Sequence, residues 1–324
     1  MRRLLPITCG LDVHRDFIDA CILIRKGRDD PEAIHMKFST MRGDLIKLRQ
    51  WLEQHNCLNV AMESTGVYWW PVYTILEETE GMNLCVVNSK EAKNLPGRKD
   101  DEDDAEWVAS LFMCGLLHYS FIPPKGIRTL REVARLYKKQ VGDRGRTLNR
   151  IGKLLQTHGF KLTSVLSNLD GVSAMRLLKK LSEDGEVSPA LVKECLARGV
   201  KKSPEEIAYA INGKLHEPQQ VLLRHLLSTL KYQTNQLEEL NNQLQVVAMP
   251  YEANIKLLCT IPGVDWLSAI YIIAETGVDM SQFETKSHWQ KKEARLISWA
   301  GLCPRNDKSA GKVKSTKSIR ATVI

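Results

Sequence analysis

Residues 97–111 read G-R-K-D-D-E-D-D-A-E-W-V-A-S-L, with five consecutive acidic residues directly before an apolar helical pattern. We predict a helix over residues 101–117. Asp101 and Asp104 would share one face of this helix, on which Val108 continues toward a core. Two carboxylates that close repel each other, and the positive end of the helix offsets only part of this repulsion. The stretch therefore indicates either a divalent-cation site or a solvated acidic helix start.

Upstream of this stretch, short apolar runs alternate with helical patterns. The segments typical of strands are residues 4–11, 17–24, 34–39, 58–62 and 84–87, and those typical of helices are residues 42–55 and 67–80. The order β-β-β-α-β-α-β-α predicts three antiparallel strands followed by alternating helices and parallel strands. The fold class that follows is α/β, with one mixed sheet flanked by helices.

Acidic residues stand at matching ends of these predicted elements. Asp12 ends the first strand and Glu63 ends the fourth, and these two strands are expected side by side in the sheet. The closing helix can then bring Asp101 and Asp104 to the same edge. Four carboxylates that hold two divalent ions about 4 Å apart suit in-line displacement at phosphorus. Taken singly, an Asp at a strand end such as Asp12 is more often a turn former, and the segment after Glu63 is also typical of a capped helix start.

The net charge of +8 is unevenly distributed along the chain. Residues 1–120 contain 14 Lys and Arg against 19 Asp and Glu, and the remaining residues contain 32 against 19. A basic second part favours a phosphate-rich partner, which the acidic first part could approach only with metal ions.

Eight cysteines are scattered without a C-x-x-C pair, and no histidines cluster at ligand spacing. We therefore expect a reduced, cytoplasmic protein without a zinc site. No window approaches the length of an apolar membrane span, so no membrane partner is expected.

Aromatic and basic segments suggest nucleic-acid contacts. Tyr68, Trp69 and Trp70 can stack on bases or pack a helix against the sheet. Residues 126–158 are helical and carry nine arginines and lysines beside an apolar series, a face that suits a nucleic-acid backbone or solvent. The basic positions are Arg128, Arg131, Arg135, Lys138, Lys139, Arg144, Arg146, Arg150 and Lys153.

Downstream, two further patterns stand out. Residues 223–247 carry apolar residues at alternating spacings of three and four, with Gln233 as the one polar position. This seam predicts either a coiled coil between two copies or a helical hairpin within the chain that pairs with residues 127–155. Residues 261–264, I-P-G-V, divide an apolar segment and predict a helix–turn–helix whose backbone N–H groups meet a phosphate or simply join core helices.

Together these motifs resemble the DEDD transposases of bacterial insertion sequences, site-specific recombinases of which members are guided by a bridge RNA. The motifs that carry the resemblance are G-L-D-V-H-R-D (10–16), A-M-E-S-T-G-V-Y-W (61–69), K-D-D-E-D-D-A (99–105), I-P-G-V (261–264) and S-W-A-G-L-C-P-R-N-D-K-S-A-G-K (298–312). They follow the family's order and spacing over nearly the whole chain.

The resemblance implies three regions. Residues 1–122 would form an RNase H-like (RuvC-like) domain, residues 123–250 a basic helical and coiled-coil region, and residues 251–324 a mainly helical C-terminal transposase domain with a helix-hairpin-helix-like turn. It implies magnesium, as two divalent ions, on Asp12, Glu63, Asp101 and Asp104.

The same resemblance implies a serine nucleophile, which maps to Ser309, with Ser298 as a second candidate. It also implies DNA, a bridge RNA and a homo-dimer or tetramer as partners. The chain departs from the family pattern at Asp100, where the family has threonine, and at Ile324, beyond which family members continue, so a truncated copy is expected.

The function expected from this resemblance is that of an insertion-sequence transposase, a recombinase that cleaves and rejoins DNA strands. Two alternatives remain open at this stage. One is a hydrolytic junction resolvase or nuclease in which Ser309 is structural, and the other is a non-enzymatic nucleic-acid-binding remnant.

Overall fold

The computed structural model describes residues 4–27, 30–64, 66–88, 103–283, 292–302, 307–309 and 312–315 of the chain. It divides the chain into two compact units, Met1–Ile122 and Pro123–Ile324, which are described separately below. No helix of the described residues combines the length and the apolar character that crossing a membrane requires.

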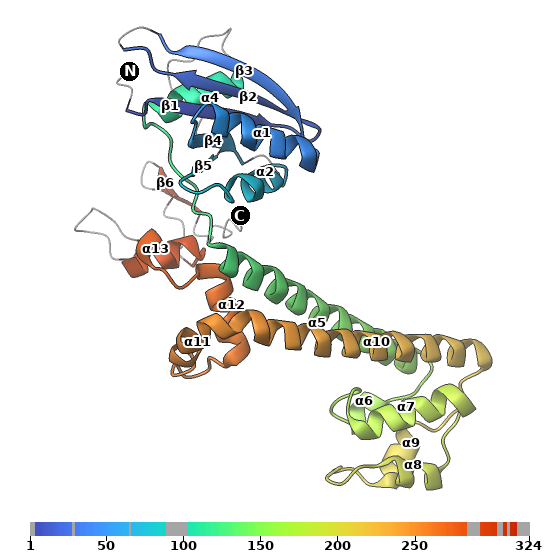
Figure 1. Cartoon of the computed structure of the whole chain (residues 1–324). Helices are drawn as coiled ribbons and strands as arrows, with labels where there is room; N and C mark the ends of the chain where they lie inside the picture. Colours follow the sequence, from blue (N-terminus) through green and yellow to red (C-terminus); the bar gives the residue numbers. More distant parts are fainter. Residues whose placement is uncertain are drawn as a thin grey trace. The chain divides into compact units, whose positions relative to one another are not determined.

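The first unit is built on a five-stranded mixed sheet in the order β3-β2-β1-β4-β5 (Figure 1). Its strands are β1 (Ile7–Val13), β2 (Phe17–Ile24), β3 (Glu32–Ser39), β4 (Asn59–Glu63) and β5 (Asn83–Val87). The pairs β1–β2 and β2–β3 are antiparallel, whereas β4 is parallel to β1 and β5 is parallel to β4. The expected mixed sheet with flanking helices, followed by a mainly helical region, is confirmed.

Helices cover both faces of this sheet. The helices α1 (Arg42–Gln54) and α2 (Trp69–Leu76) pack on one face, against strand side chains such as Leu11 and Met62. The helix α4 (Asp104–Met113) packs on the other face, where Ala61 and Cys21 contact it. The alternation of side chains along each strand therefore decides which residues lie under α4.

The helix α4 is shorter than the predicted helix over residues 101–117. Asp103 is its N-cap and has an extended backbone (φ −62°, ψ 142°), so the helix begins at Asp104 and not at Asp101. It ends at Met113, and Gly115 follows with φ +68°, a conformation that favours glycine. The predicted helix start at Asp101 was therefore too early, whereas the expectation that Asp101 and Asp104 share a helical face is not tested. Asp101 itself lies outside the described residues.

The aromatic patch at the start of α2 is mainly a packing element. Trp69 is only 2% exposed and belongs to the core beneath α1 and α2. Its ring is stacked on that of Trp70, with centroids 4.2 Å apart. Tyr68 remains 40% exposed. Of the two interpretations of this patch, packing against the sheet applies to Trp69.

The second unit contains two long antiparallel helices, α5 (Lys125–Thr157) and α10 (Glu217–Ala248) (Figure 1). Ile127 near the start of α5 packs with Ala248 at the end of α10, and Leu155 near the end of α5 packs with Leu223 near the start of α10. The apolar seam of residues 223–247 therefore pairs within the chain. Gln233 Oε1 is buried in α10 and has no hydrogen-bond partner among the described residues.

Short elements complete the second unit. Those between the long helices are α6 (Leu162–Val165), α7 (Val172–Asp184), α8 (Pro189–Cys195) and α9 (Pro204–Ala210). Those after α10 are η1 (Met249–Tyr251), α11 (Glu252–Leu258), α12 (Trp266–Thr276), η2 (Ser281–Phe283), α13 (Lys292–Trp299), β6 (Asp307–Ser309) and β7 (Lys312–Ser315). Pro250 lies in η1, directly after the end of α10 at Ala248.

Candidate active site

The register of the sheet places Asp12 and Glu63 on the face that α4 covers. Thr8 donates a hydrogen bond to the carbonyl of Ala109 in α4, so the even-numbered residues of β1, including Asp12, face this helix. In β4, Ala61 packs against α4, and Glu63 lies two residues further on the same face. Leu11 and Met62 are register partners, so Asp12 and Glu63 are the next positions along two adjacent parallel strands.

The direction of α4 brings its first residue to the same end of the sheet. The carbonyl of Met113, at the end of α4, accepts hydrogen bonds from the backbone N–H groups of Leu4 and Leu5, before β1 begins. The start of α4 therefore lies toward the carboxyl end of β1. There Ala105 packs directly on Gly10, because a Cβ atom at Gly10 would lie only 2.0 Å from the carbonyl oxygen of Ala105. Asp104 precedes Ala105 and is half-buried.

Glu63 has the environment expected of a cation ligand. Its side chain is only 5% exposed. Among the described residues, it has no ion pair or hydrogen-bond partner for its carboxylate. Burial of a carboxylate away from water is costly, and a bound cation is one way to offset that cost. The residues present therefore fit a divalent ion at this edge of the sheet.

Two further polar side chains adjoin Asp12 and were not identified from the sequence. His14 Nε2 lies 2.9 Å from Asp12 Oδ2. Asp19 is the direct cross-strand partner of Asp12 and pairs with Lys37 at 3.3 Å. Side chains alternate between the two faces of β2, so Asp19 shares a face with buried Cys21. This alternation is the sequence signal that could have identified Asp19 as a neighbour of Asp12. We call the edge of the sheet that carries Asp12, Asp19 and Glu63 the acidic edge. With Asp19 it includes a carboxylate beyond the four that were predicted.

The described carboxylates are spread over the edge and do not form a tight cluster. Within the described part of the chain, Asp12, Glu63 and Asp104 do not form a group whose ligand atoms all lie within 4.8 Å of one another. Two ions about 4 Å apart need ligands distributed over a wider space than one ion does. Asp101, the fourth predicted ligand, lies outside the described residues.

The two candidate serines belong to different elements of the second unit. Ser298 lies on α13 and is exposed. Ser309 ends β6, and its register partner is Lys312 at the start of β7.

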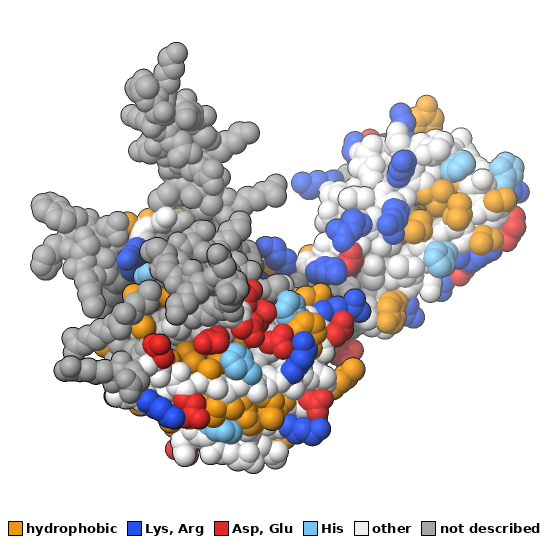
Figure 2. Space-filling view, turned by 90° about the horizontal axis from the view of Figure 1, so that it is seen from above, with side chains coloured by type: hydrophobic (Ala, Val, Ile, Leu, Met, Phe, Trp, Pro, Cys, Tyr) orange, Lys and Arg blue, Asp and Glu red, His pale blue; other side chains and the backbone are white. Residues whose placement is uncertain are grey.

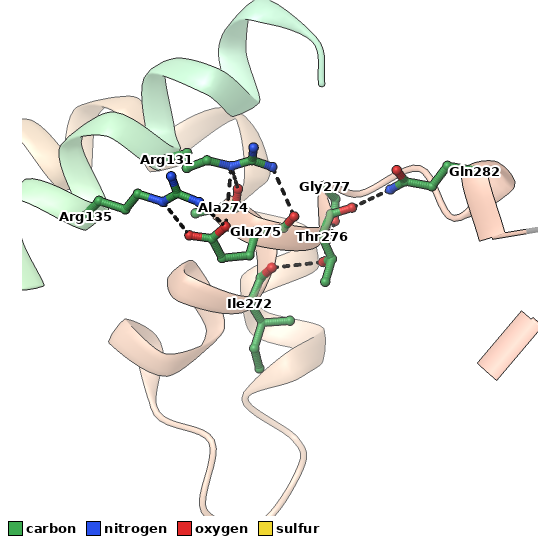
Figure 3. A network of polar contacts seen from close by, with 8 residues as sticks. All are labelled: Arg131, Arg135, Ile272, Ala274, Glu275, Thr276, Gly277 and Gln282. Carbon is green, nitrogen blue, oxygen red and sulfur yellow. Dashed lines mark hydrogen bonds and ion pairs between the residues drawn. The ribbon is translucent and has the colours of Figure 1, made fainter. Parts of the chain in front are cut away.

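Part of the basic face of α5 is occupied by contacts within the chain. Arg131 donates hydrogen bonds to the carbonyls of Ala274 (2.7 Å) and Glu275 (3.0 Å) at the end of α12 (Figure 3). Arg135 binds both carboxylate oxygens of Glu275, at 2.8 and 2.7 Å. The hydrogen bond with Arg135 lowers the pKa of Glu275 below its ordinary value. Arg131 and Arg135 thus hold α12 on α5, a contact within the chain that neither expectation for this face, nucleic acid or solvent, included.

Other cations of α5 remain on its surface. Lys139, Arg150 and Lys153 are exposed, and the described residues contain no acidic partner for them. Arg150 and Lys153 follow Lys139 by 11 and 14 residues, so the three side chains lie on one face of the helix. Figure 2 shows more Lys and Arg than Asp and Glu side chains on the visible face of the helical unit. This stripe is the part of the predicted basic face that a phosphate backbone can reach.

A groove with further cations lies between α5, α7 and α10. Its volume is about 790 Å³, and Arg176, Lys179 and Lys231 line it. Arg144 also lines this groove, but it is paired with Asp170 at 3.1 Å. The second unit therefore offers a second basic surface in addition to the stripe on α5.

The I-P-G-V turn joins α11 to α12 and is mostly exposed. Gly263 has φ +87°, which explains glycine at this position. The carboxylate of Asp265 accepts a hydrogen bond of 2.7 Å from the backbone N–H of Ser268. Asp265 therefore caps the start of α12. Its acidic side chain occupies the position at which a phosphate was one of the two expected partners of the turn.

Comparisons with known proteins identify related transposase profiles. A family profile described as "Transposase" matches residues 9–160, and one described as "Transposase IS116/IS110/IS902 family" matches residues 255–322. No curated protein matches the chain.

Solved structures similar to the chain include two of RuvC from Thermus thermophilus. One, in complex with Holliday junction substrate, is 10% identical, with a TM-score of 0.27, and the match covers 36% of this chain and 100% of that chain. The other is 15% identical, with a TM-score of 0.25, and the match covers 37% of this chain and 84% of that chain. With TM-scores this low, neither likeness bears on function.

Proposed function

The chain belongs to the IS116/IS110/IS902 family of transposases, and on that premise we propose that it cleaves and rejoins DNA strands with magnesium and a serine nucleophile. Asp12, Glu63, Asp101 and Asp104 would hold the ions, and Ser309 would attack the phosphodiester. The observation that carries this proposal is the buried carboxylate of Glu63, which is 5% exposed on the face and at the strand end that Asp12 also occupies.

The acidic edge is suited to divalent ions for a physical reason. Asp12 on β1 and Glu63 on β4 occupy neighbouring positions on two adjacent parallel strands. The N-terminus of α4 points toward the same edge of the sheet. The helix N-terminus offsets only part of the repulsion between these carboxylates. When bound, two Mg²⁺ ions stabilise the charge on the attacking and leaving oxygens of an in-line displacement at phosphorus.

The serine would provide the covalent link. A bond forms between the hydroxyl oxygen of Ser309 and phosphorus, the bond from phosphorus to the leaving sugar oxygen breaks, and the serine proton passes through water to that sugar oxygen, which leaves as a hydroxyl group. The resulting phosphoserine ester retains the energy of the broken bond, so a second strand end can displace the serine and restore a phosphodiester. Lys308 and Lys312 flank the nucleophile in sequence and are suited to neutralise the developing charge.

Nucleic-acid contacts fall to the second unit in this proposal. Lys139, Arg150 and Lys153 supply a cationic stripe on α5, and the groove between α5, α7 and α10 supplies more positive charge. We assign DNA and a guide RNA to these surfaces. A dimer or tetramer would bring two serines to two strands, as strand exchange requires.

The test is an adduct assay with the full chain, supercoiled plasmid DNA and Mg²⁺. Denaturing gels should reveal DNA attached covalently to protein, and Ser309→Ala should abolish the adduct while Ser298→Ala retains it. Glu63→Gln should abolish both cleavage and adduct.

Two results would reject parts of this proposal. Cleavage without an adduct that persists in Ser309→Ala would indicate hydrolysis by water, in which Ser309 is structural. DNA binding without cleavage, unchanged in Glu63→Gln, would indicate a binding protein that does not act on the phosphodiester.

A further inference from the structure

Three side chains of metal-binding type meet under α4 in the first unit. Cys21 on β2 and His35 on β3 are direct cross-strand partners, and Glu106 belongs to the first turn of α4. One ligand atom of each residue, Sγ, a ring nitrogen and a carboxylate oxygen, lies within 4.8 Å of the other two. Their separations in sequence, 14 and 71 residues, match no short ligand motif, which is why the sequence indicated no zinc site.

The distances between these atoms are those of ligands around one small ion. Cys21 Sγ lies 3.7 Å from His35 Nε2, and the same nitrogen lies 3.4 Å from Glu106 Oε2. Zinc bonds of about 2.3 Å to sulfur and about 2.0–2.1 Å to nitrogen and oxygen, at tetrahedral angles, separate ligands by about 3.6 Å (S to N) and about 3.3 Å (N to O). These two separations are therefore close to those that a tetrahedral ion imposes, and the third, from Cys21 Sγ to the Glu106 carboxylate, is within 4.8 Å.

The second ring nitrogen of His35 also has the surroundings of a metal-bound histidine. His35 Nδ1 lies 3.8 Å from a carboxylate oxygen of Asp103, the N-cap of α4. Histidines that bind a metal through one nitrogen commonly direct the other toward a carboxylate, which fixes the ring and raises its basicity. Asp103 is suited to this orienting position and need not touch the ion.

The cluster combines a buried ligand with access from solvent. Cys21 is 0% exposed, whereas the side chains of His35 and Glu106 are 46% and 33% exposed. An ion can therefore reach the cluster from one side, and water can complete a fourth coordination position. A thiolate and an imidazole together favour zinc or a similar transition ion over magnesium.

We propose that Cys21, His35 and Glu106 bind one Zn²⁺ ion that ties the first turn of α4 to β2 and β3. The thiol of Cys21 loses its proton to solvent as the sulfur–metal bond forms. Because Asp104 is two residues from Glu106 on the same turn, the ion also fixes the backbone that carries Asp104. This site has its own ligands and does not depend on the function proposed above.

Cobalt(II) is the probe for the test, because it occupies zinc sites and absorbs light. The full chain, freed of metal with a chelator under a thiol-free reductant, would receive Co²⁺ up to one equivalent. We expect thiolate-to-cobalt charge-transfer absorption in the near ultraviolet and the intense visible bands of tetrahedral coordination, both removed by one equivalent of Zn²⁺. An excess of Mg²⁺ should leave them unchanged.

Variants assign the bands to this cluster. Cys21→Ser should abolish the charge-transfer band, and Glu106→Gln should weaken Co²⁺ binding by more than about tenfold. Cys85→Ser is the matched control, because Cys85 is equally buried in the same unit and burial raises the pKa of its thiol to about 12. Glu63→Gln should also retain the bands, so this test is independent of the proposed magnesium site.

A second measurement follows the consequence for α4. Zn²⁺ should slow hydrogen exchange of the amides in the first turn of α4 in the wild-type chain and in Cys85→Ser, and should have no such effect in Glu106→Gln. The proposal is overturned if the wild-type chain gives no charge-transfer band, if the band persists in Cys21→Ser, or if Zn²⁺ leaves exchange in this turn unchanged. In that event His35, Glu106 and Asp103 form only an ion-pair cluster.

Discussion

Gly10 on β1 lies directly against the backbone of α4, which makes Gly10→Ala an informative perturbation. A Cβ atom at this position would lie 2.0 Å from the carbonyl oxygen of Ala105 and 2.6 Å from the backbone nitrogen of Ala109. Both are backbone atoms, so no side-chain rotation relieves the clash. To restore even the minimum separation of 3.0 Å, α4 must move away from β1.

The expected magnitude follows from two opposing effects. Replacing glycine by alanine in unstrained backbone stabilises a protein by about 0.4–1 kcal/mol through the unfolded chain, whereas overpacking costs about 1–3 kcal/mol. We therefore expect Gly10→Ala to lose about 1–2 kcal/mol of the free energy of unfolding. Because Ala105 follows Asp104, the same shift moves this carboxylate away from β1, and a misplacement of about 1 Å can cost on the order of 10²-fold in rate.

Urea unfolding of the full chain, followed by hydrogen exchange of the α4 amides, measures this effect. Gly43→Ala is the matched control, since Gly43 lies on α1 in the same unit and nothing would lie within 4 Å of its new Cβ atom. The control should be neutral or slightly stabilising. If Gly10→Ala is as stable as Gly43→Ala and leaves exchange in α4 unchanged, the close seating of α4 on β1 is refuted.

Three further perturbations test the second unit. Gln233→Leu removes a buried carbonyl oxygen that has no hydrogen-bond partner among the described residues, and it should raise the free energy of unfolding by about 1 kcal/mol; an equal gain in exposed Gln243→Leu would contradict this reason. Arg135 lowers the pKa of Glu275, so the stability from this pair is complete above the ordinary Glu pKa of about 4.3 and is lost as pH falls through the lower folded-state pKa. Between the folded-state pKa and the ordinary one, urea midpoints should fall less steeply with decreasing pH in Glu275→Gln than in the wild type, and identical pH dependence would refute the assignment. Arg150→Ala should weaken DNA binding and reduce the salt slope by about 1, whereas an unchanged slope would exclude a phosphate contact.

Much of the first unit's fold could be predicted from the sequence. Short apolar runs bounded by turn residues marked all five strands, and the order of elements predicted their mixed directions. The start of α4 was placed too early because residues 100–104 are all acidic, and acidic residues are as common before a helix as in its first turn. Only the extended backbone of Asp103 locates the boundary.

Features that depend on contacts between distant residues were harder to predict. The seam of residues 223–247 specifies a partner helix but not whether that partner belongs to the same chain, and the structure supplies α5. The sequence does not distinguish Arg131 and Arg135 from the other cations of α5, because their partners on α12 are distant in the chain. Asp19 required the exact strand register to be recognised as the partner of Asp12. The roles of the carboxylates and of Ser309 remain predictions.

Binding of Mn²⁺ to the full chain, measured from the electron paramagnetic resonance of the free ion, tests the central claim that the acidic edge under α4 holds divalent ions. The account predicts that Glu63→Gln weakens Mn²⁺ binding by at least about tenfold, whereas Glu80→Gln, which alters an exposed glutamate, and Cys21→Ser retain wild-type affinity. Equal Mn²⁺ affinity in the wild type and in Glu63→Gln would contradict it.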